Sequence, residues 1–147
     1  NNKNMATTTA TINISSDIIS GVPINISKTM TMNKLQSNIG LEETSGLRSK
    51  KFTATTAVSI VEEDEYENTK ASKVYIRNTG SSSSDYFYVA KHASAAASDT
   101  DGETIGKLYG GNWMLIPYLA DVNITVAPST ADTMTLEYMV FAEGMLS

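Results

Sequence analysis

The sequence predicts an all-β fold: a single-domain antiparallel β-sandwich, jelly-roll-like, with an extended N-terminal arm. The chain has 147 residues, a length that suits one domain with a sizeable core. Short runs rich in Thr, Val, Ile and Tyr alternate between apolar and polar residues, and clusters of Gly, Ser, Asn and Asp separate them. A succession of such short strands is typical of a sandwich or jelly roll.

The alternation predicts a series of strands and no convincing helix. In chain order the strands are expected at residues 6–14, 24–35, 51–62, 72–78, 86–92, 103–109, 113–118, 122–127 and 134–141. The Ala-rich segment 93–98 is short and lacks an apolar stripe, so we assign it to a loop.

Two of these strands have a clear apolar face. In the second strand the residues on this face, which Lys28 interrupts, are Ile24, Ile26, Met30 and Met32. In the last strand they are Met134, Leu136, Tyr138 and Val140. Each face is expected to pack against other apolar residues.

Turn residues organise the connections. The segment 79–85, "TGSSSSD", and the pair Gly110 and Gly111 are interpreted as hairpin turns between neighbouring strands. No repeat or charged linker divides the chain. We therefore expect an N-terminal leader and arm at residues 1–20 and one β-sandwich domain at residues 21–147.

The composition excludes several classes of function. The chain has no cysteine, so disulfides, thiolate metal sites and cysteine nucleophiles are absent. A formal net charge of -5 disfavours nucleic acid as a partner, and no apolar stretch approaches the roughly 20 residues that span a bilayer. The opening residues lack the hydrophobic middle of a secretory signal.

Residues for catalysis or metal binding are scarce. His92 is the only histidine, and no Gly-x-Ser-x-Gly elbow is present, so we expect no catalytic residue, no cofactor and no metal site. The sequence "DTDGE" resembles a fragment of a calcium loop through Asp99, Asp101, Gly102 and Glu103. A loop whose aspartates cap turns is the interpretation we favour, because the other positions of a calcium loop are missing.

Candidate interaction residues form three groups. The Thr-rich N-terminal strand, able to add to the sheet edge of another subunit, contributes Thr7, Thr9 and Thr11. A basic run that would face the acidic segment 62–67 of a neighbouring subunit contributes Arg48, Lys50 and Lys51, although a solvated acidic loop is the interpretation we favour. An aromatic platform for sugars would consist of Tyr109, Trp113 and Tyr118, although packing of the single tryptophan in the core is the interpretation we favour.

Several segments together resemble small virion structural proteins of tailed bacteriophages. They are "MATTTATINISSDI", "GLRSKKFT", "KVYIRNTGSSSSDYFYVA", "GKLYGGNWMLIPY", "DVNITVAPST" and "LEYMVF". The order of these segments is similar to that in capsid decoration or cement proteins, and in related head or tail surface proteins, of marine and cyanobacterial phages.

The resemblance implies a virion location on the capsid surface, with no enzymatic activity. It implies binding to the lattice of the major capsid protein as a homo-oligomer, for which a trimer fits shell geometry, without nucleic acid or membrane. Three alternatives remain open: a tail, collar or fibre-associated virion protein, a carbohydrate-binding module, and, more remotely, a hydrolase built around His92.

Overall fold

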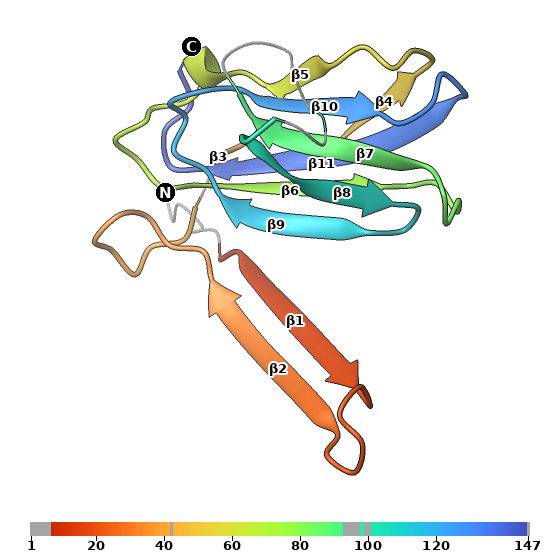
Figure 1. Ribbon diagram of the computed structural model, residues 1–147. Helices are drawn as coiled ribbons and strands as arrows, with labels where there is room; N and C mark the ends of the chain where they lie inside the picture. Colours follow the sequence, from red (N-terminus) through yellow and green to blue (C-terminus); the bar gives the residue numbers. More distant parts are fainter. Residues whose placement is uncertain (1–6, 42, 93–97, 99–100, 147) are drawn as a thin grey trace.

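A computed structural model describes residues 7–41, 43–92, 98 and 101–146, and within them two antiparallel sheets face each other across one core (Figure 1). The first sheet has the order β5 (Val58–Val61), β10 (Ile124–Pro128), β7 (Tyr86–Lys91) and β8 (Thr104–Tyr109). The second has β4 (Arg48–Phe52), β11 (Met134–Ala142), β6 (Ser72–Asn78) and β9 (Trp113–Pro117), with the short β3 (Glu43–Thr44) beside β11. The all-β, antiparallel sandwich is confirmed.

The first two strands form a hairpin of their own. β1 (Thr9–Ser16) pairs along its length with β2 (Ile24–Thr31), and neither strand joins a sheet of the sandwich. Figure 1 shows this hairpin, here called the arm, projecting from the sandwich. The arm therefore includes residues 24–31, which the sequence-based division placed with the sandwich domain.

Strand pairing in the sandwich is nested around the middle of the chain. β7 pairs with β8, β6 with β9, β5 with β10 and β4 with β11. The two sheets then form because β7 also pairs with β10 and β6 with β11. Most consecutive strands from β4 onward consequently lie in opposite sheets.

The predicted hairpins at 79–85 and at Gly110 and Gly111 are wrong, since β6 and β7 lie in different sheets, as do β8 and β9. Both segments instead cross from one sheet to the other at the same end of the sandwich. They pack so closely that a Cβ on Gly110 would lie 2.6 Å from the Ser82 nitrogen. The turn residues were recognised, but the strands they join pair with distant partners.

Asn78 joins the two crossing segments. Its buried side chain donates to the Leu108 carbonyl (2.9 Å) and accepts from the Gly80 amide (2.9 Å). Its backbone amide donates to the Asn112 carbonyl, and its carbonyl accepts from Gly111. A buried amide side chain with these partners is fully compatible with the core.

The strand predicted at residues 51–62 is two strands. β4 ends at Phe52 and pairs with β11, whereas β5 begins at Val58 and pairs with β10 in the other sheet. The Thr- and Ala-rich segment 53–57 makes the crossing, and its alternation resembles that of a continuous strand. This similarity explains the error.

Alternation places the core as expected for the last strand. In β11 the buried side chains are Met134, Leu136, Tyr138, Val140 and Ala142. From the other sheet Phe87, Val89, Ile124 and Val126 face them, and Phe52 packs edge-on against Phe87 with ring centroids 5.2 Å apart. Period-two burial on both inner faces is the pattern of a packed sandwich.

Replacing Leu136 with Ala should lower the free energy of unfolding by about 2–5 kcal/mol, because its fully buried side chain fills the space between the sheets. The matched control is Leu47→Ala, since Leu47 is 63 % exposed and loses little burial. Urea unfolding of both variants tests this. Equal losses in the free energy of unfolding would contradict the placement of Leu136 in the core.

Candidate functional site

The arm has one apolar and one polar face. Cross-strand partners share a face, and on one side the pairs are Ala10 with Met30, Ile12 with Lys28, Ile14 with Ile26 and Ser16 with Ile24. Ile24, Ile26 and Met30 were expected to share an apolar face with Met32 in the second strand, and the register confirms this for the three that lie within β2. Most side chains on this face of the arm are exposed, with Ile14 at 44 % and Ile26 at 42 %.

The opposite face of the arm carries only hydroxyl and amide side chains. Its cross-strand pairs are Thr9 with Thr31, Thr11 with Thr29, Asn13 with Ser27 and Ser15 with Asn25. The Thr11 and Thr29 hydroxyls are hydrogen-bonded at 2.8 Å. This side suits contact with water, whereas the apolar side does not.

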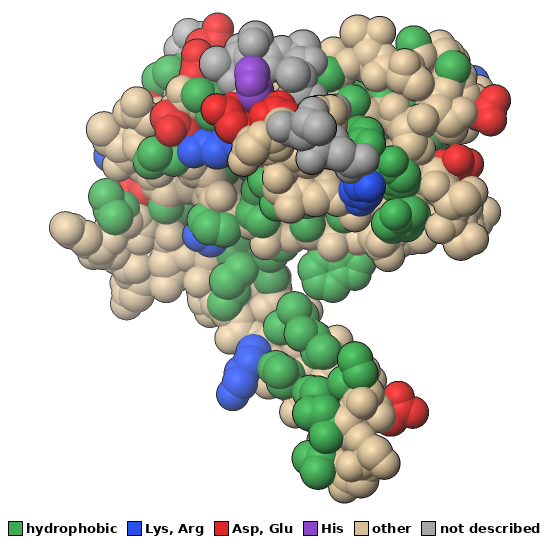
Figure 2. All heavy atoms as spheres, in the orientation of Figure 1, with side chains coloured by type: hydrophobic (Ala, Val, Ile, Leu, Met, Phe, Trp, Pro, Cys, Tyr) green, Lys and Arg blue, Asp and Glu red, His purple; other side chains and the backbone are tan. Residues whose placement is uncertain are grey.

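The apolar face continues onto the sandwich. Where the arm leaves the sandwich, a hollow of about 250 Å³ lies between arm and sheet. The residues that line it are Ala10, Thr11, Ile12, Lys28, Thr29, Met30, Trp113 and Leu115. Trp113 is the first residue of β9 and is 51 % exposed. Its side chain lies on the outer face of the sheet, as the pairing of Trp113 with Arg77 shows. Figure 2 shows hydrophobic side chains along the arm and at its junction with the sandwich.

A second hollow, of about 460 Å³, adjoins the first on the outer face of β6 and β9. It reaches from Thr9 and Met32 at the base of the arm to Tyr75, Arg77 and Phe141. Arm and sheet therefore enclose an angle whose inner surface is largely apolar. We call this surface, with the apolar face of the arm, the arm groove.

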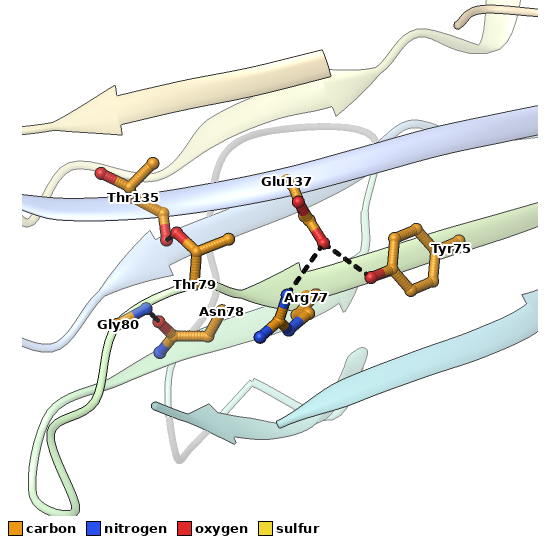
Figure 3. A network of polar contacts seen from close by, with 7 residues as sticks. All are labelled: Tyr75, Arg77, Asn78, Thr79, Gly80, Thr135 and Glu137. Atoms are coloured by element: carbon orange, nitrogen blue, oxygen red, sulfur yellow. Dashed lines mark hydrogen bonds and ion pairs between the residues drawn. The ribbon is translucent and has the colours of Figure 1, made fainter. Parts of the chain in front are cut away.

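Glu137 holds the polar residues at the edge of the arm groove. Its Oε1 accepts a hydrogen bond from the Tyr75 hydroxyl (2.7 Å) and pairs with Arg77 Nη1 (3.4 Å), as Figure 3 shows. Burial and the Glu137 carboxylate together raise the pKa of Tyr75, so its hydroxyl stays protonated and donates. In the same view Thr79 donates to the Thr135 carbonyl (3.0 Å).

The segment that follows the arm packs back on the base of the arm and is then tied to the sandwich. Met32 and Leu41 are buried there, and the Met32 amide donates to the Thr8 carbonyl while the Leu41 amide donates to that of Met32. Glu143, just after β11, accepts from the amides of Leu35 (2.9 Å) and Ala71 (3.1 Å) through one oxygen. This carboxylate thus ties the segment that follows the arm to the end of β11.

The three groups of predicted interaction residues are only partly brought together. Thr9 and Thr11, on the polar face of the arm, line the second hollow with Trp113, and Thr7 is exposed. Arg48, Lys50 and Lys51 lie on β4, at the opposite edge of the sheet from β9 and Trp113. Charged residues on an edge strand discourage pairing with another sheet.

The predicted aromatic platform is also divided. Tyr118 lies in the core at 4 % exposure, its hydroxyl donates to the Val122 carbonyl (2.8 Å), and burial raises its pKa. Trp113 is exposed beside the arm, whereas Tyr109 ends β8 in the other sheet. Tyr118 is therefore unavailable for stacking on a sugar.

Tyr109 belongs to a different aromatic cluster. Its ring lies 5.1 Å from that of Tyr86, which lies 5.0 Å from Tyr88, and Lys107 Nζ sits 4.7 Å from the Tyr86 centroid. These residues share the outer face of β7 and β8, because Tyr86 pairs with Tyr109 and Tyr88 with Lys107. The alternation Tyr86-Phe87-Tyr88 indicated that face, but only the register identified its neighbours.

His92 lies at the base of the β7–β8 connection beside two carboxylates. Its Nε2 is 3.4 Å from Glu103 Oε2 and 3.9 Å from Asp101 Oδ2. Asp101 and Glu103 come from the suspected calcium loop, whose Asp99 lies outside the described residues, as do residues 1–6 and 93–97. Sequence reasoning considered the loop and the histidine separately and missed this association.

Comparison with known proteins gives no assignment: no protein-family model, curated protein or solved structure matches the chain. Among the described residues, no helix has the length and apolar character needed to cross a membrane.

Neutralising Glu143 should make the protein less stable near pH 7 and leave it unchanged in acid. The amide of Leu35, with that of Ala71, holds the pKa of Glu143 below its ordinary value. A carboxylate whose pKa is lowered by folding stabilises the folded state fully at pH values above its pKa in the unfolded chain, which is about 4.3. This stabilisation is lost as the pH falls through the pKa in the folded state.

The test is urea unfolding of Glu143→Gln at pH 7 and pH 3. Because the carboxylate is partly exposed, we expect a loss of less than about 1 kcal/mol at pH 7 and none at pH 3. Asp132→Asn removes an exposed carboxylate elsewhere and serves as the control. A difference that grows in acid would contradict the role assigned to Glu143.

Proposed function

We propose that this protein is a non-enzymatic virion structural protein that binds an assembled phage capsid and stabilises it as a decoration or cement protein. The observation that carries the proposal is the arm groove: an amphipathic hairpin, outside both sheets, whose exposed apolar face continues onto the sandwich at Trp113. Attachment to a neighbouring subunit of the shell accounts for that face.

Physical chemistry favours a partner on the arm. An isolated two-stranded hairpin is marginal in water, and burying apolar surface contributes roughly 25 cal/mol per Å². The residues exposed on the apolar face and tip of the arm are Ile12, Ile14, Ile18, Ile19, Val22, Ile26 and Met30. A contiguous exposed apolar surface of this kind is typical of a site at which another protein binds.

The nested strand pairing supports a jelly roll as the type of sandwich. In a jelly roll an antiparallel ribbon folds over itself, so that the first strand pairs with the last and each successive strand pairs further inward. The pairs β4–β11, β5–β10, β6–β9 and β7–β8 follow this order. Jelly rolls recur in viral capsid proteins and in lectins.

Binding to the assembled lattice would stabilise it by mass action. A protein that binds the lattice of the major capsid protein, and not its free subunits, adds its binding free energy to the shell. Copies arranged as a homo-oligomer would match the local symmetry of a shell, and a trimer is the oligomer we propose. The same arm would serve a tail, collar or fibre protein, which differs only in location.

A second candidate function is carbohydrate binding, favoured by the cluster of Tyr86, Tyr88, Tyr109 and Lys107. Three neighbouring tyrosine rings, inclined to one another, lie on an outer sheet face, and aromatic rings of this kind provide apolar surfaces on which sugars stack. This surface replaces the platform first expected from Tyr109, Trp113 and Tyr118.

The arm proposal predicts that Ile14→Thr with Ile26→Thr abolishes capsid binding. These two residues face each other across the strands, and threonine keeps the strand propensity while removing apolar surface. Sedimentation of the purified variant with heads of the source phage measures the binding, and cryo-electron microscopy locates the bound wild-type protein.

The matched control is Asn13→Thr with Ser27→Thr, the neighbouring pair on the polar face. It should bind as the wild type does. If both double variants bind equally well, the arm is not the attachment site. Density confined to the tail or collar would move the protein to that location, and absence from source virions would remove the virion proposal.

The carbohydrate alternative predicts that glycans bind at Tyr86 and Tyr109. A glycan array followed by titration of the wild type and Tyr109→Ala would detect this, with Trp113→Ala as the control for the other exposed aromatic residue. Binding lost in Tyr109→Ala alone supports the glycan function, and no bound glycan on the array argues against it.

A further inference from the structure

We infer that His92, Asp101 and Glu103 form a binding site for a divalent transition-metal ion of the zinc type at the base of the β7–β8 connection. One ligand atom from each residue lies within 4.8 Å of the other two. The site is independent of the arm groove, and its test does not depend on the virion proposal.

The distances suit a small metal ion. With bonds of 2.0–2.2 Å in tetrahedral geometry, ligand atoms lie about 3.3–3.6 Å apart. His92 Nε2 is 3.4 Å from Glu103 Oε2, which lies within this range, and 3.9 Å from Asp101 Oδ2. The two carboxylates offer oxygens within 4.8 Å of each other, so a bound ion would draw the aspartate inward. Three protein ligands leave one position for water or another ligand.

A buried oxygen of Asp101 also indicates a bound cation. Its Oδ2 is shielded from solvent and accepts no hydrogen bond within the described part of the chain, although it faces His92. Its other oxygen, Oδ1, accepts from the Glu103 amide at 2.9 Å. A buried carboxylate oxygen without a donor is costly, and a bound cation would remove that cost.

Charge also favours a cation. Asp101 and Glu103 place two carboxylates beside the His92 ring. Lys91, the cation next to His92 in the sequence, is paired with Asp121 at 2.6 Å. A divalent ion would balance the two carboxylates.

The backbone that carries the three ligands is held in place. The Lys91 amide donates to the Glu103 carbonyl (3.2 Å), and the His92 amide donates to that of Asn123 (3.0 Å). The Thr104 amide donates to the Asp101 carbonyl (3.1 Å). The hydrogen bond from the Glu103 amide to Asp101 Oδ1 orients Oδ2 toward His92, as outer-shell partners orient metal ligands.

The mixture of ligands selects the class of metal. Imidazole with carboxylates suits zinc and neighbouring transition metals, whereas calcium and magnesium prefer oxygen ligands alone. This assignment differs from the calcium loop suggested by "DTDGE" because the histidine joins the two carboxylates.

The test uses untagged protein freed of metal by a chelator, titrated with zinc chloride in a calorimeter. We expect one zinc ion per chain. Because His92 is the only histidine, its imidazole signals in the NMR spectrum report the site directly and should shift on zinc binding. Cobalt chloride, which absorbs visible light when tetrahedrally coordinated, is a second probe.

Variants separate this site from adventitious binding. Glu103→Gln and Asp101→Asn should each weaken zinc binding about tenfold or more, and His92→Gln should abolish it. Asp132→Asn, which removes an exposed carboxylate elsewhere, should bind as the wild type does. Glu103 is 57 % exposed, so its replacement keeps the test informative if another variant fails to fold.

Three results would overturn the inference. They are the absence of zinc binding with unchanged His92 signals, zinc binding that persists undiminished in both carboxylate variants, and stronger binding of calcium chloride than of zinc chloride.

Discussion

The rest of the structure depends on the packing of β6 and β11 against β7 and β10. These strands lie inside both sheets, and the fully buried Ile76, Leu136, Phe87 and Val126 lie between them. Apolar burial on this scale is the dominant favourable contribution to folding. The outer strands pair with these central strands. Because paired strands lie far apart in the sequence, the chain must cross between the sheets to reach each partner.

The arm presents the opposite situation. Its strands alternate between apolar and polar residues as a sandwich strand does, yet they form a two-stranded sheet with most of its apolar side chains exposed. The Glu143 carboxylate ties the segment that follows the arm to the end of β11. A surface that is apolar and exposed is suited to recognising another protein, which is why the proposed function centres on it.

The histidine cluster lies elsewhere and follows a different principle. The arm groove offers apolar area, whereas His92, Asp101 and Glu103 offer a few polar atoms at fixed distances. The connection between β7 and β8 brings them together because both of its ends are anchored by backbone hydrogen bonds. The metal inferred there would strengthen one connection of the sandwich, independently of what the arm binds.

The sequence by itself determined the fold class, most strand positions and the apolar faces of β2 and β11, because period-two alternation is a local property that adjacent residues express. Only the tertiary structure decided that 79–85 crosses between sheets, that residues 51–62 form two strands and that Tyr118 is buried while Trp113 is exposed. It also brought Trp113 to the arm and His92 to Glu103. These outcomes depend on which strands pair, and pairing is fixed by contacts between residues far apart in the chain, which a local pattern does not specify.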